Sequence, residues 1–410
     1  MRWNISKKSL IGIWCMVFWS VFAIQLIPKL FGGALNIIIY FSFFFILLGF
    51  SHGKINVNIP ISLGVLLYSV IVFAILKERN TISFFGITMN YSAYKMIFWV
   101  MGIACGALFL QQSKAEDLIK FRSVYIPVVV SNMLANLFIT IFIDPTASKY
   151  AGKTSDGIVG VSDYDSIYSL VLIVPILFYF VLKSKGREKR RSIILFVLSL
   201  VYVFKSTFFI AILACILGIV FVLLNQLQNK TGKLFGMLIL GSMAVFFVIR
   251  SDLIFEMMLY VADHVNSPSL STRLIELVGV LRDGKDAVDA VVRLDIYTEM
   301  INGFFRHPFL GCIIAEPEIY INYAGHTTIL DTLCGYGLIT FVPLFCGFNK
   351  LIKSIRGMLS RECQDIFQCC YWVFIFIAFF NPVTNGYLMM CTMVTVPYVL
   401  LRSSQILKGE

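Results

Sequence analysis

Residues 207–224 read TFFIAILACILGIVFVLL, eighteen consecutive residues without one charged side chain. A helix that crosses the hydrocarbon core of a bilayer needs about 20 predominantly apolar residues, and this stretch is close to that length. The whole chain is 59% hydrophobic and only 14% charged. So small a polar fraction cannot cover the surface of a water-soluble globule. The sequence therefore predicts a polytopic membrane protein.

Similar apolar stretches recur along the chain and predict an all-α fold of about twelve transmembrane helices. They cover residues 9–27, 34–50, 59–76, 93–110, 123–143, 165–182, 191–204, 207–224, 234–249, 328–347, 366–380 and 386–401. The first stretch follows MRWNISKK, as a secretory signal would. Its apolar core is too long for a signal and has no small-residue cleavage site, so we expect a membrane anchor.

The distribution of Lys and Arg predicts how the chain is oriented. With the N-terminus in the cytoplasm, the cytoplasmic segments hold about 21 of the 34 basic residues, the short outer loops about 7 and the long outer loop about 6. Short cytoplasmic loops carry such a positive excess. We therefore expect an even number of spans with both termini in the cytoplasm. The net charge of +11 then reflects topology and some affinity for anionic lipid, and it gives little support to a nucleic-acid partner.

The ten cysteines do not indicate a disulfide framework or a zinc site. Nine of them fall in predicted spans or on the cytoplasmic side, and only Cys312 lies in the long outer loop. A single external thiol has no intramolecular partner, and the chain contains no C-x-x-C pair. The cysteines are interpreted as small core residues.

The chain divides into three parts. Residues 1–249 are predicted to form transmembrane helices 1–9, residues 250–327 an extracytoplasmic helical cap, and residues 328–410 transmembrane helices 10–12 with a cytoplasmic tail. The cap contains two segments with apolar residues at helical spacing. They are STRLIELVGVLRD, with Leu274, Leu277, Val278 and Leu281, and RLDIYTEMINGFF, with Ile296, Met300 and Phe304. The proline and glycine of RHPFLG, residues 306–311, are expected to end the second helix.

The cap carries five arginines, which the positive-inside bias does not explain. They are Arg250, Arg273, Arg282, Arg293 and Arg306. A guanidinium group binds phosphate oxygens through two parallel N–H donors. We therefore expect a phosphorylated lipid headgroup as the anionic partner at this depth.

Structural roles stay open for several of these residues. Arg293 follows Asp289 by four residues, a spacing that also suits a surface ion pair. Arg282 lies in the charged turn LRDGKD, and Arg306 with His307 lies at a predicted helix end, where capping is favoured.

His326 and Asp331 lie in GHTTILDTLCGYGL, residues 325–338, where the cap meets the tenth predicted span. An aspartate at membrane depth is costly unless it is paired or faces water, so it marks a candidate functional site. A histidine beside a glycine suits a proton acceptor. The alternatives are an interfacial histidine and an aspartate paired with an arginine of the cap. The glycines of CGYGL are interpreted as close-packing residues.

RLDIYTEMINGFFRHPFLG, followed after about 15 residues by GHTTILDTLCGYGL, resembles the core of the O-antigen polymerase and ligase superfamily. The resemblance is nearest to Wzy-type polymerases of O-antigen and capsular polysaccharide. It implies a fold like that of the GT-C class of glycosyltransferases and an enzyme of the bacterial cytoplasmic (inner) membrane. The implied reaction joins undecaprenyl-diphosphate-linked oligosaccharides at the outer face, without a metal ion or another cofactor. A chain-length regulator and a flippase are the implied protein partners.

The resemblance also implies site residues. Arg293 and His326 match the arginine and histidine of the motif and are the predicted catalytic residues. Members commonly carry an S-R pair at the outer start of the eighth span, where this chain has KST, so Lys205 either replaces that arginine or the position is unused. A snorkelling role for Lys205 fits equally well. The predicted substrate-binding residues are Arg273, Lys205, Asp331 and Tyr297.

The chemistry agrees with this assignment. Diphosphate is a good leaving group, so transfer requires stabilisation of its developing charge, which arginines supply, and deprotonation of the acceptor hydroxyl, which His326 can supply as general base. No D-x-D stands in the first two outer loops, residues 28–33 and 77–92, which fits a metal-independent site.

Three other functions fit part of the sequence. A ligase shares every feature above and differs only in its acceptor. A flippase or transporter also has about twelve spans, but it is expected to show two related halves and no folded cap of this size. A structural scaffold leaves the cap arginines and Asp331 unexplained.

Overall fold

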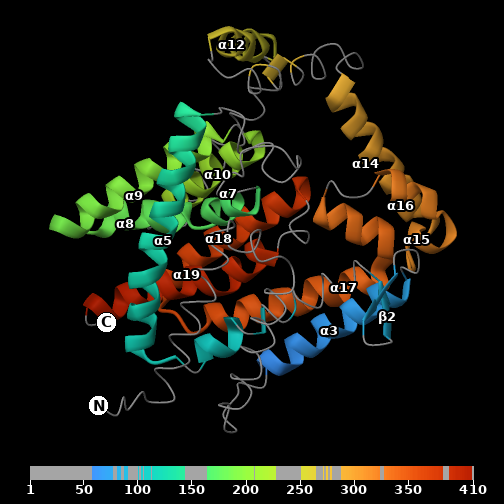
Figure 1. Ribbon diagram of the computed structural model, residues 1–410, viewed down its shortest axis with the longest axis horizontal. Helices are drawn as coiled ribbons and strands as arrows, with labels where there is room; N and C mark the ends of the chain where they lie inside the picture. The colour runs from blue at the N-terminus through green and yellow to red at the C-terminus, as the bar shows by residue number, and fades with distance from the viewer. Residues whose placement is uncertain are drawn as a thin grey trace.

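The computed structural model describes residues 58–76, 81–84, 87–90, 100, 103–104, 106–111, 113–143, 164–206, 208–227, 251–264, 271, 274–275, 278, 288–323, 327–381 and 387–408. Nearly all of these residues are helical, and Figure 1 shows most of the helices lying side by side in one bundle. The exception is a hairpin in which β1 (Thr81–Phe84) pairs antiparallel with β2 (Ile87–Asn90). The all-α prediction is correct for the bundle and missed this hairpin.

The described helices follow the chain in this order. They are α3 (Asn58–Leu76), α5 (Ala115–Phe142), α7 (Tyr164–Val171), α8 (Val174–Lys183), α9 (Gly186–Lys205), α10 (Phe209–Gln226), α12 (Ser251–His264), α14 (Val288–Arg306), α15 (Cys312–Ala315), α16 (Pro317–Tyr323), α17 (Thr328–Arg356), α18 (Arg361–Phe380) and α19 (Tyr387–Lys408).

Four described segments are long and apolar enough to cross a membrane. They are Ala115–Phe142, Ser166–Lys183, Thr328–Arg356 and Arg361–Phe380, and Ile210–Gln226 is a shorter apolar helix. Each overlaps a stretch that the sequence predicted to span the bilayer. The predicted spans at residues 9–27, 34–50 and 234–249 lie outside the described residues. These apolar helices indicate a membrane protein.

Residues 165–182 were predicted as one span, but the structure interrupts them by a turn at Leu172 and Ile173. The physical reason is Pro175 near the start of α8. A proline donates no backbone hydrogen bond, and its ring clashes with the carbonyl four residues earlier. The ring also contacts α10 closely, because a Cβ added to Gly218 would lie 2.9 Å from Cγ of Pro175.

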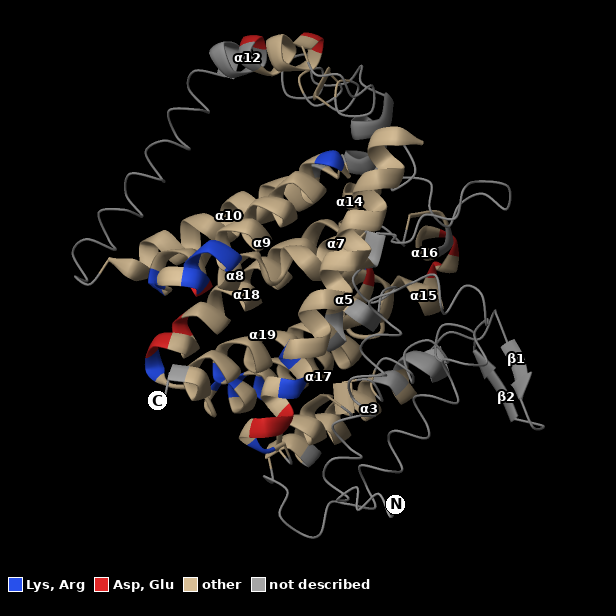
Figure 2. Cartoon of the chain, turned by 60° about the vertical axis from the view of Figure 1, so that its left-hand side comes forward, with Lys and Arg blue, Asp and Glu red and all other residues tan. Residues whose placement is uncertain are grey.

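Basic residues gather at one end of the bundle, as Figure 2 shows near the C-terminus. The part of the bundle where α8 ends, α9 begins, α17 ends and α18 begins is called the basic end below. An ion pair of 3.0 Å joins Lys183 of α8 to Glu362 of α18 there. At the opposite end, α17 begins and α18 ends. Between the two ends lies a continuous apolar core that includes Phe121, Tyr168 and Phe367.

Candidate functional site

The first part of the site is a break in α17 at Gly337. Its backbone angles, φ 68° and ψ −174°, are not helical. The N–H groups of Leu338 and Ile339 therefore lack helical acceptors and donate instead to the turn that follows α14. Leu338 bonds the carbonyl oxygen of Pro308 at 2.9 Å, and Ile339 bonds that of Phe309 at 3.2 Å. We call this contact between residues 308–311 and 335–339 the helix joint.

Two glycines permit this close approach. A Cβ on Gly337 would lie 2.2 Å from the carbonyl oxygen of Phe309, and one on Gly311 would lie 2.1 Å from that of Gly335. Gly311 also has a positive φ of 76°, a conformation that side chains disfavour. The sequence predicted close packing for CGYGL and a turn for RHPFLG. The structure confirms both and shows that each packs against the other.

Two tyrosines fill the space beside the joint. The Tyr336 hydroxyl donates to the Tyr320 hydroxyl oxygen at 2.9 Å, and the rings meet edge to face with centroids 5.2 Å apart. Gly335 makes room for the Tyr320 ring, which would lie 2.4 Å from an added Cβ. Burial raises the pKa of Tyr320, and the hydrogen bond from Tyr336 opposes that rise only in part. The Tyr320 phenol therefore stays protonated and neutral at physiological pH.

The start of α17 is capped by its own side chains. Thr327 is the N-cap residue, and its hydroxyl oxygen accepts a hydrogen bond from the N–H of Leu330 at 2.9 Å. Oδ2 of Asp331 accepts from the N–H of Thr327 at 3.2 Å. A carboxylate in the first turn is also stabilised by the helix dipole. Asp331 thus has a structural function, and its predicted contact with substrate stays a prediction.

The same helix start is tied to the end of α18. The backbone N–H and the hydroxyl of Thr328 both donate to the carbonyl oxygen of Asn381, at 3.1 and 3.3 Å. Asn381 is buried, and among the described residues no acceptor lies within hydrogen-bond distance of its side-chain Nδ2. A buried, unsatisfied N–H donor is costly, so this amide near the start of α17 is well placed to bind a polar group.

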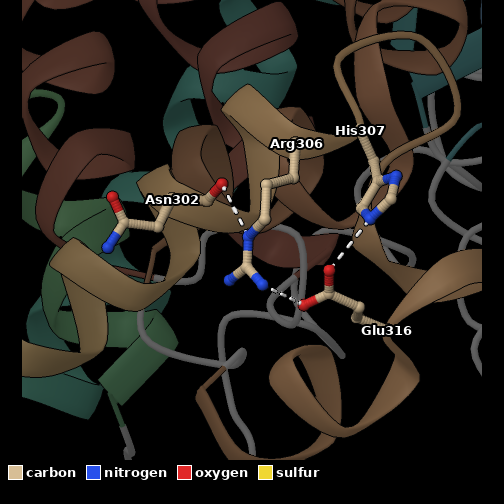
Figure 3. A network of polar contacts seen from close by, with 4 residues as sticks. All are labelled: Asn302, Arg306, His307 and Glu316. Atoms are coloured by element: carbon tan, nitrogen blue, oxygen red, sulfur yellow. Dashed lines mark hydrogen bonds and ion pairs between the residues drawn. The ribbon is translucent and has the colours of Figure 1, made fainter.

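A charged network fixes the turn between α14 and α15, as Figure 3 shows. Arg306 forms an ion pair of 2.6 Å with Glu316, and Nε2 of His307 lies 3.0 Å from the other oxygen of the same carboxylate. Nε of Arg306 also donates to the carbonyl of Asn302 at 3.4 Å, close to the end of its own helix. The expected capping role of Arg306 is therefore part of its function, and the sequence did not reveal its partner Glu316.

The structure places the predicted site residues unevenly. His326 and Arg273 lie outside the described residues. Arg293 belongs to α14, but its side chain is also outside the described part. Tyr297 is half-buried on α14, and Lys205 is exposed at the end of α9.

The helix pattern predicted for the cap agrees with the described residues. Ile296 and Met300 are buried on α14, as the spacing of apolar residues required. Leu274 and Val278 are helical and buried as well, while Ile275 between them is exposed. The predicted apolar faces therefore do point into the protein.

Sequence reasoning missed a buried polar stripe on α5. Asn132, Asn136 and Thr140 recur every fourth residue and are all buried in the half of α5 away from the basic end. Nδ2 of Asn136 donates to the carbonyl oxygen of Asn132 at 2.7 Å. Spacing of four on an otherwise apolar span was the available signal, because such residues share one helix face.

Among the described residues, no group of three or more His, Cys, Asp or Glu side chains is arranged to hold a metal ion. No protein-family model matches the sequence, and no curated protein matches it significantly.

Proposed function

We propose that this protein is a polysaccharide polymerase of the cytoplasmic membrane. It transfers a growing glycan from undecaprenyl diphosphate to another lipid-linked repeat unit at the outer face. In this proposal about twelve helices cross the bilayer, residues 250–327 form the outer cap, and both termini lie in the cytoplasm. The basic end of the bundle is then cytoplasmic, which is the orientation that an excess of Lys and Arg favours.

The observation that carries the proposal is the helix joint. Its two backbone hydrogen bonds, from Leu338 to Pro308 and from Ile339 to Phe309, fasten the end of α14 to the middle of α17. α14 carries Arg293 and Tyr297, and α17 begins two residues after His326. The segments that resemble the polymerase motif are thereby fixed to one another by backbone contacts. Precise placement of two motif segments is what a two-substrate site needs.

Both motif segments lie within a few helical turns of the joint. At about 1.5 Å per residue, Arg293 lies roughly 20 Å along α14 from Arg306. Thr328 lies roughly 14 Å along α17 from Gly337 by the same measure. α14 connects the joint to Arg293, and the first part of α17 connects it to the residue that follows His326 by two positions. A helix therefore links the joint to each motif segment.

The proposed reaction forms one glycosidic bond and breaks one. The hydroxyl of the acceptor sugar attacks the anomeric carbon of the donor glycan, and undecaprenyl diphosphate leaves with the electron pair of the broken bond. His326 takes the hydroxyl proton as general base. Arg293 and Arg273 bind the diphosphate and stabilise the charge that develops on it. Lys205, Tyr297 and Asp331 are the proposed contacts to the sugars.

The test is the ladder of lipid-linked and surface glycans in cells that lack the gene. Cells complemented with wild type should form long chains, whereas cells with no copy or with His326→Ala should accumulate single repeat units. His264→Ala is the matched control, because His264 is exposed on α12 and contacts Tyr260 of its own helix, with its Nδ1 2.8 Å from the carbonyl oxygen and the two rings stacked. Protein levels are measured in every strain.

Other outcomes of this experiment would overturn the proposed function or the proposed role of His326. Long chains that remain on the lipid carrier in the null strain would make the protein a ligase. Absence of any repeat unit at the outer face would make it a flippase. Full activity of His326→Ala at normal protein level would remove His326 from the mechanism.

A further inference from the structure

A cavity of about 340 Å³ lies between α5, α8, α9 and α19, on the side of the bundle away from the helix joint. Its volume falls in the range of small-molecule sites. Most of its lining is apolar, and includes Ile126, Val130 and Met133 of α5 and Ile173 and Leu177 near α8. The charged side chains in its lining are Arg122, Glu188 and Arg191, which lie where the cavity approaches the basic end of the bundle. The cavity is thus polar at one end and hydrocarbon-like along the rest.

Arg122 is the unusual member of this lining. Its guanidinium carbon lies 5.7 Å from the centre of the Phe180 ring, which orients the group by a cation–π contact. Nη1 is buried, and no hydrogen-bond acceptor among the described residues reaches it. A buried guanidinium N–H without an acceptor is costly unless a bound anion supplies one.

The charges of the lining also favour an anion. Two arginines and one glutamate leave a net charge of +1, and the hydroxyl groups of Ser123, Ser184 and Ser192 add neutral donors. Further positive charge outside the cavity comes from three exposed residues of α9, Arg187, Lys189 and Arg190. The negative charge of a single phosphodiester group would balance the net charge of the lining.

We propose that this cavity binds an acidic phospholipid, with its phosphate held by Arg122 and Arg191 and one acyl chain along the apolar wall. A phosphate on a lipid tail is the shared chemistry of phospholipids and polyprenyl phosphates. The phospholipid is favoured because the site lies at the basic end, which the proposed orientation places in the anionic cytoplasmic leaflet. The proposed polymerase site lies at the opposite end of α17, so this is a second lipid site.

The test uses the purified full-length protein, titrated with phosphatidylglycerol, phosphatidylcholine or undecaprenyl phosphate and monitored by native mass spectrometry. Wild type should bind one phosphatidylglycerol, and Arg122→Gln should weaken that binding roughly tenfold or more, since a charge-assisted hydrogen bond is lost. Arg190→Gln is the matched control with the same charge change on α9 outside the cavity, and it should change the affinity by about twofold at most.

A second pair of variants keeps the test decisive if Arg122→Gln folds poorly. Val130→Phe should fill the apolar part and weaken binding, whereas Leu134→Phe on the same helix should not, because Leu134 is 52% exposed and does not line the cavity. Equal binding of phosphatidylcholine, equal losses in Arg122→Gln and Arg190→Gln, or tighter binding of undecaprenyl phosphate would each overturn the proposal. A failure here leaves the glycan ladder unchanged, so the two proposals are tested separately.

Discussion

Tyr336 of α17 and Tyr320 of α16 share a hydrogen bond of 2.9 Å beside the broken point of α17. The two residues are 16 positions apart in sequence, and each contacts the joint through Gly335 or its neighbours. This pair therefore joins α16 to α17.

Replacement of Tyr336 by Phe should destabilise the protein by about 1 kcal/mol, because the buried Tyr320 oxygen loses its donor. The measurement is the denaturant midpoint of the purified protein. Tyr323→Phe on α16, the helix that carries Tyr320, is the control and should have a smaller effect. Equal effects of the two substitutions would show that the hydroxyl pair contributes little.

Replacement of Gly337 by Ala should prevent folding or destabilise the protein by about 3 kcal/mol or more, because a positive φ and a backbone clash act together. Two controls separate these causes. Gly186 has φ 57° with open space around an added Cβ, and Gly64 lies within α3, also with open space. Gly186→Ala should therefore cost about 1 kcal/mol, and Gly64→Ala should be neutral or slightly stabilising. Thermal unfolding of the three variants gives the comparison. A mild effect of Gly337→Ala would mean that the joint relaxes easily.

Replacement of Thr327 by Ala should cost about 1 kcal/mol, since α17 loses its N-cap acceptor. Asp331→Asn keeps an oxygen that can accept the Thr327 N–H but removes the negative charge. If Asp331 acts only as a cap, Asn should retain most of the stability and all of the glycan polymerisation. Loss of polymerisation without loss of stability in Asp331→Asn would instead assign it a direct contact with substrate.

Burial raises the pKa of the Cys312 thiol from 9.0 to about 11. At a pH between these two pKa values, the Cys312 thiol is deprotonated in the unfolded chain but still protonated in the folded protein. The free energy of unfolding therefore falls as pH rises. Cys312→Ala should reduce that fall by about 2 kcal/mol between about pH 8 and about pH 10.5. Cys346→Ala, at an exposed position, is the control. The check is chemical denaturation at the two pH values, and identical slopes in all proteins would contradict the prediction.

The sequence predicted the helices well because long apolar stretches leave the backbone few alternatives in a membrane. The start of α3 at Asn58 and the end of α18 at Phe380 agree closely with the predicted spans at 59–76 and 366–380. The interruption before Pro175 was missed, although that proline was a sufficient local signal for it. Local features with local causes could therefore be predicted.

The helix joint could not be predicted in the same way. CGYGL suggested close packing, but the positive φ of Gly337 depends on a turn about 30 residues earlier that supplies the acceptors for Leu338 and Ile339. Glu316 was likewise missed, since its partners Arg306 and His307 are 10 and 9 residues away. The capping role of Asp331 had a local signal, because threonine and aspartate side chains near a helix start often accept hydrogen bonds from free backbone N–H groups.

The helix joint also bears on biogenesis. The N–H groups of Leu338 and Ile339 have acceptors only when the carbonyl groups of Pro308 and Phe309 are in place beside them, and hydrocarbon offers no other acceptor. The turn precedes the break in the chain, so it has already been synthesised when the second half of α17 emerges from the ribosome. We therefore expect the turn and the broken helix to enter the bilayer together, as one insertion step.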